Sequence, residues 1–188
     1  MAYVRFPIPE FKYAELKNMA WTAPTFLAEG EIKRLTAGQK ANDASVYGSY
    51  PIKPSDAFFD KVNVRGDHRH VVMCVLPNKP VKVLGRSHSW YIQRAVAVDS
   101  LDPGAAKTVF EWKTARPMNT RLGPDDGVTI DGGVVYVVCG RSYADHWIGN
   151  RTIVDNQWNK GRGFRVLSAV SDDVDDFHGI YLAFEWTP

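Results

Sequence analysis

From residue 70 to residue 186 the sequence is a series of short runs rich in Val, Ile, Tyr, Phe and Trp. Such residues favour extended strands, and the Gly, Pro, Asn and Asp between the runs favour turns. The runs cover residues 70–76, 81–85, 89–98, 108–112, 127–130, 133–140, 151–158, 164–170 and 179–186. Helical segments between the runs are scarce, which argues against a parallel α/β sheet. The pattern predicts an all-β fold, an antiparallel β-sandwich of jelly-roll type or a barrel.

Two connections have the residues of tight turns. Residues 76–80 contain two prolines between two runs, and Asp131-Gly132-Gly133 separates two others. Because glycine supplies the positive φ that hairpin turns require, we expect a hairpin at each place. The longer connections 99–107, 113–126 and 141–150 are where we expect a binding site, since loops carry most such sites.

Residues 1–60 differ from the rest because they carry five prolines and no sustained alternation. The chain length of 188 residues suits one β domain, residues 61–188, preceded by an extended, partly helical N-terminal arm. Within the arm we expect helices over 9–20 and 29–36, a polar loop over 39–50 and a capped turn at 55–59.

Large aromatic side chains are frequent in this arm. A segment that stays exposed to solvent would not carry so many of them. We expect Phe6, Phe11, Tyr13 and Trp21 to pack against the chain's own domain or a neighbouring subunit. Arms and edge strands of this kind pair between subunits, and symmetric assembly buries them. The leading prediction is therefore a non-enzymatic structural protein that forms a homo-oligomer, with a virion (capsid or tail) as its setting.

Charge and composition exclude several classes of function. The chain has 23 basic and 21 acidic residues, so nucleic-acid binding is disfavoured. No apolar run reaches the roughly 20 residues of a membrane span, and no signal peptide begins the sequence. We expect a soluble protein made in the cytoplasm. No P-loop, GxGxxG or HExxH motif is present, which predicts no cofactor and argues against an enzyme. Cys74 and Cys139 lie in apolar runs, as free thiols or as one disulfide.

One loop alternates aromatic and cationic residues and is the main candidate for ligand binding. Trp158, Lys160, Arg162 and Phe164 flank its glycines, although both aromatic residues also suit a core. Trp90 and Trp147 are further candidates. A carbohydrate- or ligand-binding β-sandwich module, with a glycan as partner, is the alternative function.

His68 and His70 have the i, i+2 spacing that places two histidines on one face of a strand, where they can chelate a metal. With Gly66 and Gly85, they resemble the first motif of the cupin family of metal-binding β-barrels. That resemblance implies a metal-dependent enzyme, the second alternative. The sequence departs from the family pattern because residues 71–76 are apolar where the acidic ligand belongs.

Two further patterns carry weaker chemistry. Asp145-His146, near Ser142 and Cys139, has the residue types of general-base catalysis but no nucleophile motif. The acidic stretch over residues 171–177 lacks the glycine and glutamate of an EF-hand and fits a solvated turn.

Overall fold

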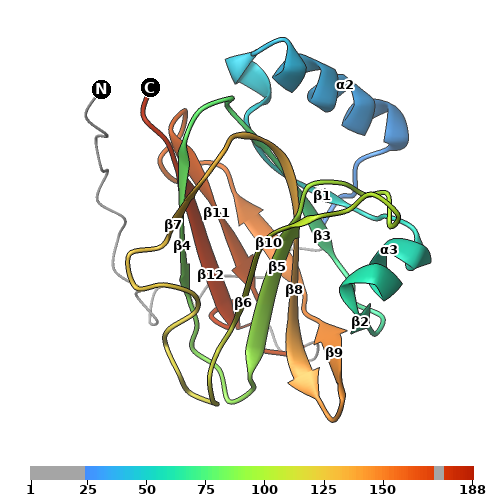
Figure 1. Cartoon of the computed structure of the whole chain (residues 1–188), viewed down its shortest axis with the longest axis vertical. Coiled ribbons are helices and arrows are strands. Elements are labelled where there is room, and N and C mark those ends of the chain that lie inside the picture. Colours follow the sequence, from blue (N-terminus) through green and yellow to red (C-terminus); the bar gives the residue numbers. More distant parts are fainter. Residues whose placement is uncertain (1–23, 172–175) are drawn as a thin grey trace.

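The computed structural model describes residues 24–171 and 176–188 and has two β-sheets packed face to face (Figure 1). The strands are β1 (Gly48–Ile52), β2 (Val64–Arg65), β3 (Val71–Leu76), β4 (Val81–Arg86), β5 (Gln93–Val98), β6 (Thr108–Lys113), β7 (Val128–Ile130), β8 (Gly133–Tyr143), β9 (His146–Gly149), β10 (Thr152–Asp155), β11 (Gly163–Ser168) and β12 (Ile180–Glu185). The helices are α2 (Glu29–Lys40), the 3₁₀ turn η1 (Ala44–Val46) and α3 (Asp56–Val62). The predicted antiparallel β-sandwich is confirmed.

Sheet A has the strand order β1-β3-β8-β5-β6, with β9 pairing to β8 and β2 pairing to β9. Sheet B has the order β10-β11-β12-β4-β7. Among the described strands, the pair β2–β9 is parallel and the other pairs are antiparallel.

The main core lies between the sheets, because successive side chains of a strand point to opposite faces. Strand β3 shows this most clearly: Val72, Cys74 and Leu76 belong to the core between the sheets, and Val71, Met73 and Val75 to a second core. All six residues of β3 are buried. Sheet A is therefore covered on both faces at β3.

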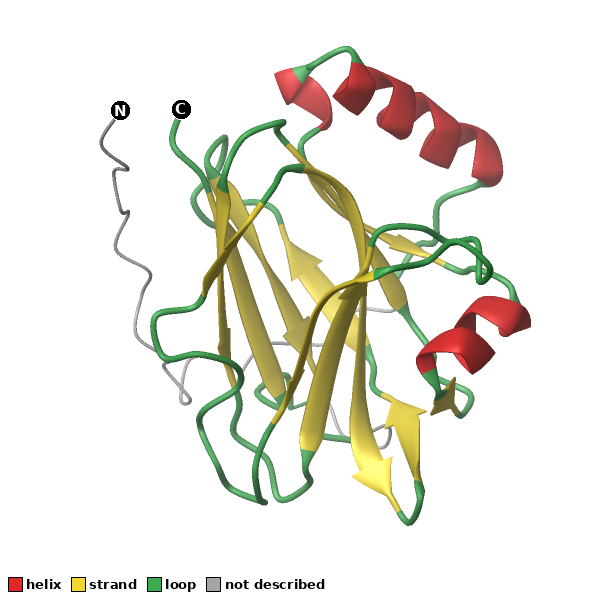
Figure 2. Cartoon of the chain, viewed as in Figure 1, coloured by secondary structure: helices red, strands yellow, loops and turns green. Residues whose placement is uncertain are grey.

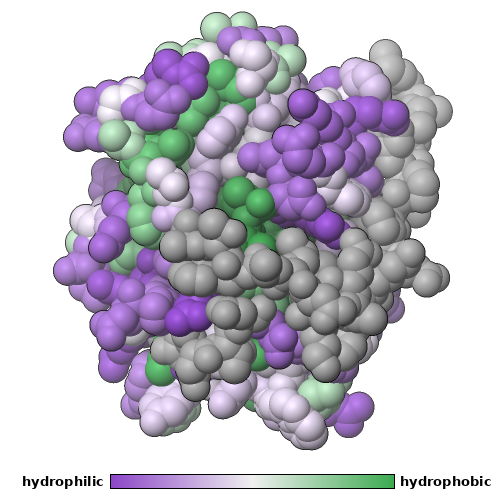
Figure 3. Space-filling model, turned by 180° about the vertical axis from the view of Figure 1, so that it is seen from behind, coloured by the Kyte–Doolittle hydropathy of each residue, from purple (hydrophilic) through white to green (hydrophobic). Residues whose placement is uncertain are grey.

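The helices form a third layer on the outer face of sheet A (Figure 2). Leu35 of α2 and Phe58, Phe59 and Val62 of α3 are buried in the second core. Helix α2 begins with Glu29 and Glu31 and ends at Lys40, which complements the helix dipole. Seen from behind, apolar residues reach the surface beside α2, among hydrophilic ones (Figure 3).

Both expected hairpins are wrong. Residues 77–80 lead from β3 in sheet A to β4 in sheet B, and Asp131-Gly132 leads from β7 in sheet B to β8 in sheet A. Each turn therefore crosses between the sheets. The two turns touch, because a Cβ on Gly132 would lie 1.4 Å from the carbonyl oxygen of Pro77. Glycine at 132 is thus required by this contact.

The polar loop expected over 39–50 contains η1 and the start of β1, and the expected connection 141–150 contains β9. The predicted helix over 29–36 is confirmed and continues to Lys40, and the turn at 55–59 becomes α3. The helix predicted over 9–20 lies outside the described residues. None of the helices in the described part of the chain is long and apolar enough to cross a membrane.

One side chain joins the edges of the two sheets. Asn156, which follows β10 of sheet B, accepts hydrogen bonds at Oδ1 from the backbone N–H of Ser49 (2.9 Å) and from its Oγ (2.7 Å). Its Nδ2 donates to the carbonyl oxygen of Ser49 at 2.9 Å. Asn156 thus satisfies both backbone groups of a buried residue in β1, as a neighbouring strand would.

Candidate functional site

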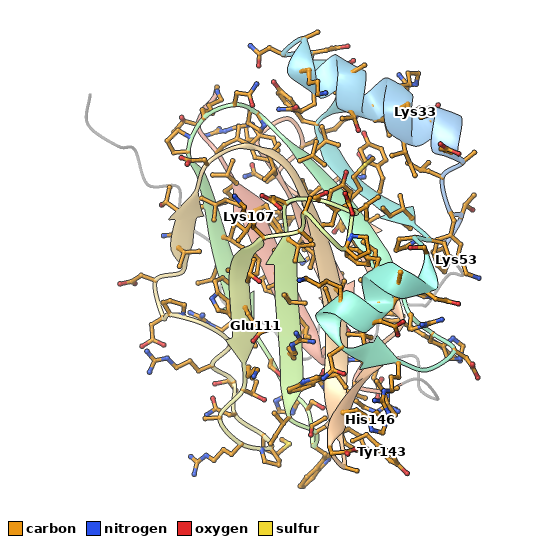
Figure 4. All side chains as sticks on the ribbon, turned by 45° about the vertical axis from the view of Figure 1, so that its right-hand side comes forward. Lys33, Lys53, Lys107, Glu111, Tyr143 and His146 are labelled. Carbon is orange, nitrogen blue, oxygen red and sulfur yellow. The ribbon has the colours of Figure 1, made fainter. Side chains whose placement is uncertain are left out.

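Large apolar side chains are exposed at the end of the sandwich where β5 begins and β8 ends. Trp90 is 79% exposed, Tyr91 45% and Met118 38%. Since Gln93 pairs with Arg141, the loop before β5 lies beside the β8–β9 hairpin. Tyr143 and His146 lie together at the tip of that hairpin (Figure 4). Exposed aromatic residues that gather in this way mark interaction sites.

A hollow of about 170 Å³ opens beside Trp90. Its described lining combines aromatic, thioether, imidazole and carboxylate groups: His88, Ser89, Trp90, Tyr91, Met118, Val170, Asp176 and His178. The lining comes from three segments, the loop before β5, the loop after β6 and the connection before β12. We call this the Trp90 hollow.

Hydrogen bonds to both neighbouring segments hold the loop that carries Trp90. On one side, the backbone N–H of Met118 donates to the carbonyl oxygen of Ser89 at 2.7 Å. On the other, the N–H of His88 donates to the carbonyl oxygen of His178 at 2.9 Å, and Ser87 Oγ donates to that of Gly179 at 2.6 Å. Met118 has a φ of 60°, a conformation that non-glycine residues seldom adopt. The exposed indole therefore sits on a fixed loop.

Beneath the loop lies a buried network of polar side chains. Gln93 Nε2 donates to Ser89 Oγ at 2.8 Å, and Gln93 Oε1 accepts from Asn150 Nδ2 at 2.8 Å. Ser89 Oγ also accepts from the backbone N–H of Tyr91 at 3.0 Å. Gln93 and Asn150 are fully buried. Satisfied buried networks fix a single arrangement, so this one orients Trp90 and Tyr91 before any ligand arrives.

The two histidines of the hollow are in contact, with ring centroids 5.5 Å apart. His178 Nδ1 lies 2.6 Å from the carbonyl oxygen of His88 and must donate, because a carbonyl only accepts. His178 Nε2 then faces the Asp176 carboxylate at 3.7 Å. Burial, followed by the neighbouring His178, lowers the pKa of His88. His88 is therefore harder to protonate than an ordinary histidine.

The three tryptophans predicted as binding residues lie in three different places. Trp90 is at the hollow. Trp147, on β9, is half-buried against the second core, with the guanidinium of Arg94 5.4 Å from its ring centre. Trp158 packs against the outer face of sheet B, beside Leu167 and Tyr181. The structure does not bring them together as one platform.

The loop predicted to alternate aromatic and cationic contacts packs both of its aromatic residues against the sandwich, Phe164 fully and Trp158 partly. Phe164 is fully buried and stacks on Phe184 in the core, so it cannot touch a surface ligand. Lys160 lines another hollow, of about 270 Å³, together with Tyr47. Arg162 is half-exposed, and its backbone pairs with that of Trp186. This loop, between β10 and β11, is at the opposite end of the sandwich from the Trp90 hollow.

His70 has a structural role. Its Nδ1 accepts a hydrogen bond from the backbone N–H of Thr152 at 3.0 Å, and its ring packs against Phe26. Burial lowers the pKa of His70 to about 4. His68 is half-exposed next to it. Within residues 24–171 and 176–188, no three His, Cys, Asp or Glu side chains gather as a metal site requires. The predicted assembly residues, Phe6, Phe11, Tyr13 and Trp21, lie outside the described residues.

Asp145 and His146 do form a pair, with Oδ1 and Nδ1 3.1 Å apart, at the tip of the β8–β9 hairpin. The nearby thiol of Cys139 is buried, and burial raises its pKa to about 12. Cys74 is also buried, and burial raises its pKa well above the usual value. Both cysteines are free. Neither thiol is a nucleophile for this histidine.

Sequence reasoning missed most of the Trp90 hollow. Tyr91 stood inside an expected strand, and His88 and His178 stood alone in the sequence. No local signal joins His88 to His178, because only the pairing of β4 with β12 brings them together.

Comparisons with known proteins leave the chain without a family. No family model and no curated protein matches it. Among solved structures, the C-terminal domain of the BC2L-C lectin from Burkholderia cenocepacia is similar, with a TM-score of 0.44 and 18% sequence identity. The match covers 61% of this chain and 92% of that domain. A likeness at this level supports no conclusion on function.

Proposed function

We propose that the chain is a carbohydrate-binding β-sandwich module and that the Trp90 hollow is its site. The observation that carries the proposal is Trp90 itself, a side chain that is 79% exposed yet stands on a loop anchored by buried hydrogen bonds. Exposing the apolar surface of an indole to water has an unfavourable free energy. A ligand that covers the indole removes this surface from water, which favours binding.

The other groups of the hollow suit a sugar. A pyranose ring has an apolar face that stacks on an indole, and its hydroxyls need acceptors and donors at the edge. The Asp176 carboxylate can accept such bonds, and the His88 ring lines the same hollow. Because the loop is fixed, little conformational entropy is lost on binding.

A glycan array followed by titration of intrinsic tryptophan fluorescence tests the proposal. Trp90→Ala is expected to weaken binding of any array hit by about tenfold or more, since the stacked ring supplies most of the contact area. Tyr143→Ala is the matched control, because Tyr143 is 57% exposed at the same end of the molecule but does not line the hollow. An array without hits, or equal losses in both variants, contradicts the proposal.

The homo-oligomeric assembly protein remains a prediction, because it depends on the arm. Size-exclusion chromatography with light scattering tests it: an oligomer is expected, and deletion of residues 1–25 should abolish it. A monomer at micromolar concentration contradicts it. If Trp90→Ala dissociates an oligomer without affecting glycan binding, the hollow is instead a protein interface.

A further inference from the structure

We infer that the ligand of the Trp90 hollow carries a protonated amine, which makes an amino sugar with a free amino group the favoured ligand class. The inference rests on the proposed function and adds the charge of the ligand to it. Of the eight described residues that line the hollow, Asp176 is the only one with a carboxylate, and none is Lys or Arg.

The aromatic wall favours a cation. The face of an aromatic ring carries negative potential, and tryptophan attracts ammonium groups most strongly. Trp90 is largely exposed, and the polarisable thioether of Met118 lies beside it in the same hollow. A neutral hydroxyl at the same place gains no such attraction.

Asp176 supplies the opposite charge. Its side chain is 42% exposed, and it lies in the same hollow as the indole. An ammonium group has three N–H donors, so it can bond the carboxylate and contact the ring at once. An N-acetylated sugar has no charge and a single N–H, and it gains neither effect fully.

The position of Arg141 favours the Trp90 ring over the Tyr91 ring as the contact of the amine. Its guanidinium lies 5.6 Å from the centre of the Tyr91 ring, although Arg141 does not line the hollow. A cation already placed on Tyr91 repels a second one there. The amine is therefore assigned to Trp90 and Asp176, with Tyr91 left to contact the apolar part of the sugar.

Calorimetric titration with glucosamine, N-acetylglucosamine, glucose and tetramethylammonium chloride tests the inference. At neutral pH, glucosamine is expected to bind about tenfold more tightly than the two neutral sugars. Asp176→Asn should reduce that preference, because it weakens the binding of glucosamine by a larger factor than the binding of the two neutral sugars. Asp67→Asn, a change of another exposed carboxylate outside the hollow, is the control and should keep it.

The outcomes separate the two proposals. Equal affinity for glucosamine and glucose overturns the inference on charge and leaves the carbohydrate site standing. Binding of tetramethylammonium but of no sugar, abolished by Trp90→Ala, supports the cation site and overturns the carbohydrate function. Binding of none of the four probes overturns both.

Discussion

Replacing Asn156 by alanine tests whether one side chain holds the edges of the two sheets together. The substitution removes three hydrogen bonds to Ser49, at 2.9, 2.7 and 2.9 Å. Each contributes about 0.5–1.5 kcal/mol net, and the buried N–H of Ser49 is left without this acceptor. We therefore expect Asn156→Ala to lower the free energy of unfolding by about 3 kcal/mol.

Two further variants divide this loss. Ser49→Ala removes only the hydroxyl bond and should cost about 1 kcal/mol. Asn156→Asp keeps the acceptor for the Ser49 N–H and Oγ but loses the donor to the carbonyl oxygen, so its cost should lie between the other two. Because Ser49→Ala and Asn156→Ala remove one bond in common, the double variant should cost less than their sum.

Urea unfolding followed by circular dichroism gives the free energies, with unchanged m-values as the check that the variants remain two-state. The reasoning is refuted if Asn156→Ala unfolds within about 0.5 kcal/mol of the parent chain, the range of ordinary surface substitutions. It is also refuted if the two single changes are strictly additive.

Three other predictions follow from buried ionisable groups. The pKa of His70 is about 4 in the folded chain, against 6.5 for an ordinary histidine, so the unfolded state binds more protons between these two pH values. The free energy of unfolding should therefore fall by up to about 3 kcal/mol as the pH drops through this window. Urea titrations of His70→Gln should no longer show this pH dependence. Burial raises the pKa of Glu185, so stability should fall as the pH rises above the ordinary glutamate pKa; Glu185→Gln should be more stable than the parent at neutral pH but not in acid, and equal stability at both would contradict this. Both thiols, at Cys74 and Cys139, should react with Ellman's reagent only after denaturation, and a fast reaction in the folded chain would show that one is accessible.

The sequence predicted the strands well where they are buried on both faces. Residues 71–76 and 180–184 are continuous apolar runs because a core lies on each side of them. β1 escaped prediction for the opposite reason: it is an edge strand containing Pro51, which an edge tolerates because one side of its backbone needs no ladder partner. The Gly, Ser and Pro residues of β1 therefore make its sequence resemble a loop.

Turn residues predicted where the chain reverses but not which sheet the next strand joins. Which sheet β7 and β8 each join depends on contacts with distant strands and on the fit of Gly132 against Pro77. Prediction of the binding site is limited in the same way, because the site also depends on contacts between distant parts of the sequence. The residue type of Trp90 makes it a candidate, but its exposure depends on β5 beginning at Gln93, and its neighbour His178 comes from the far end of the sequence.

The double burial of β3 has a consequence for how the chain tolerates mutation. In a sandwich with one solvated face, every second strand position accepts polar residues, so a substitution scan shows a striped pattern. Here the side chains of residues 71–76 pack alternately into two separate cores. A scan should show one unbroken band of intolerance across β3, and neighbouring positions should fail for different reasons, one by loosening the helices and the next by separating the sheets.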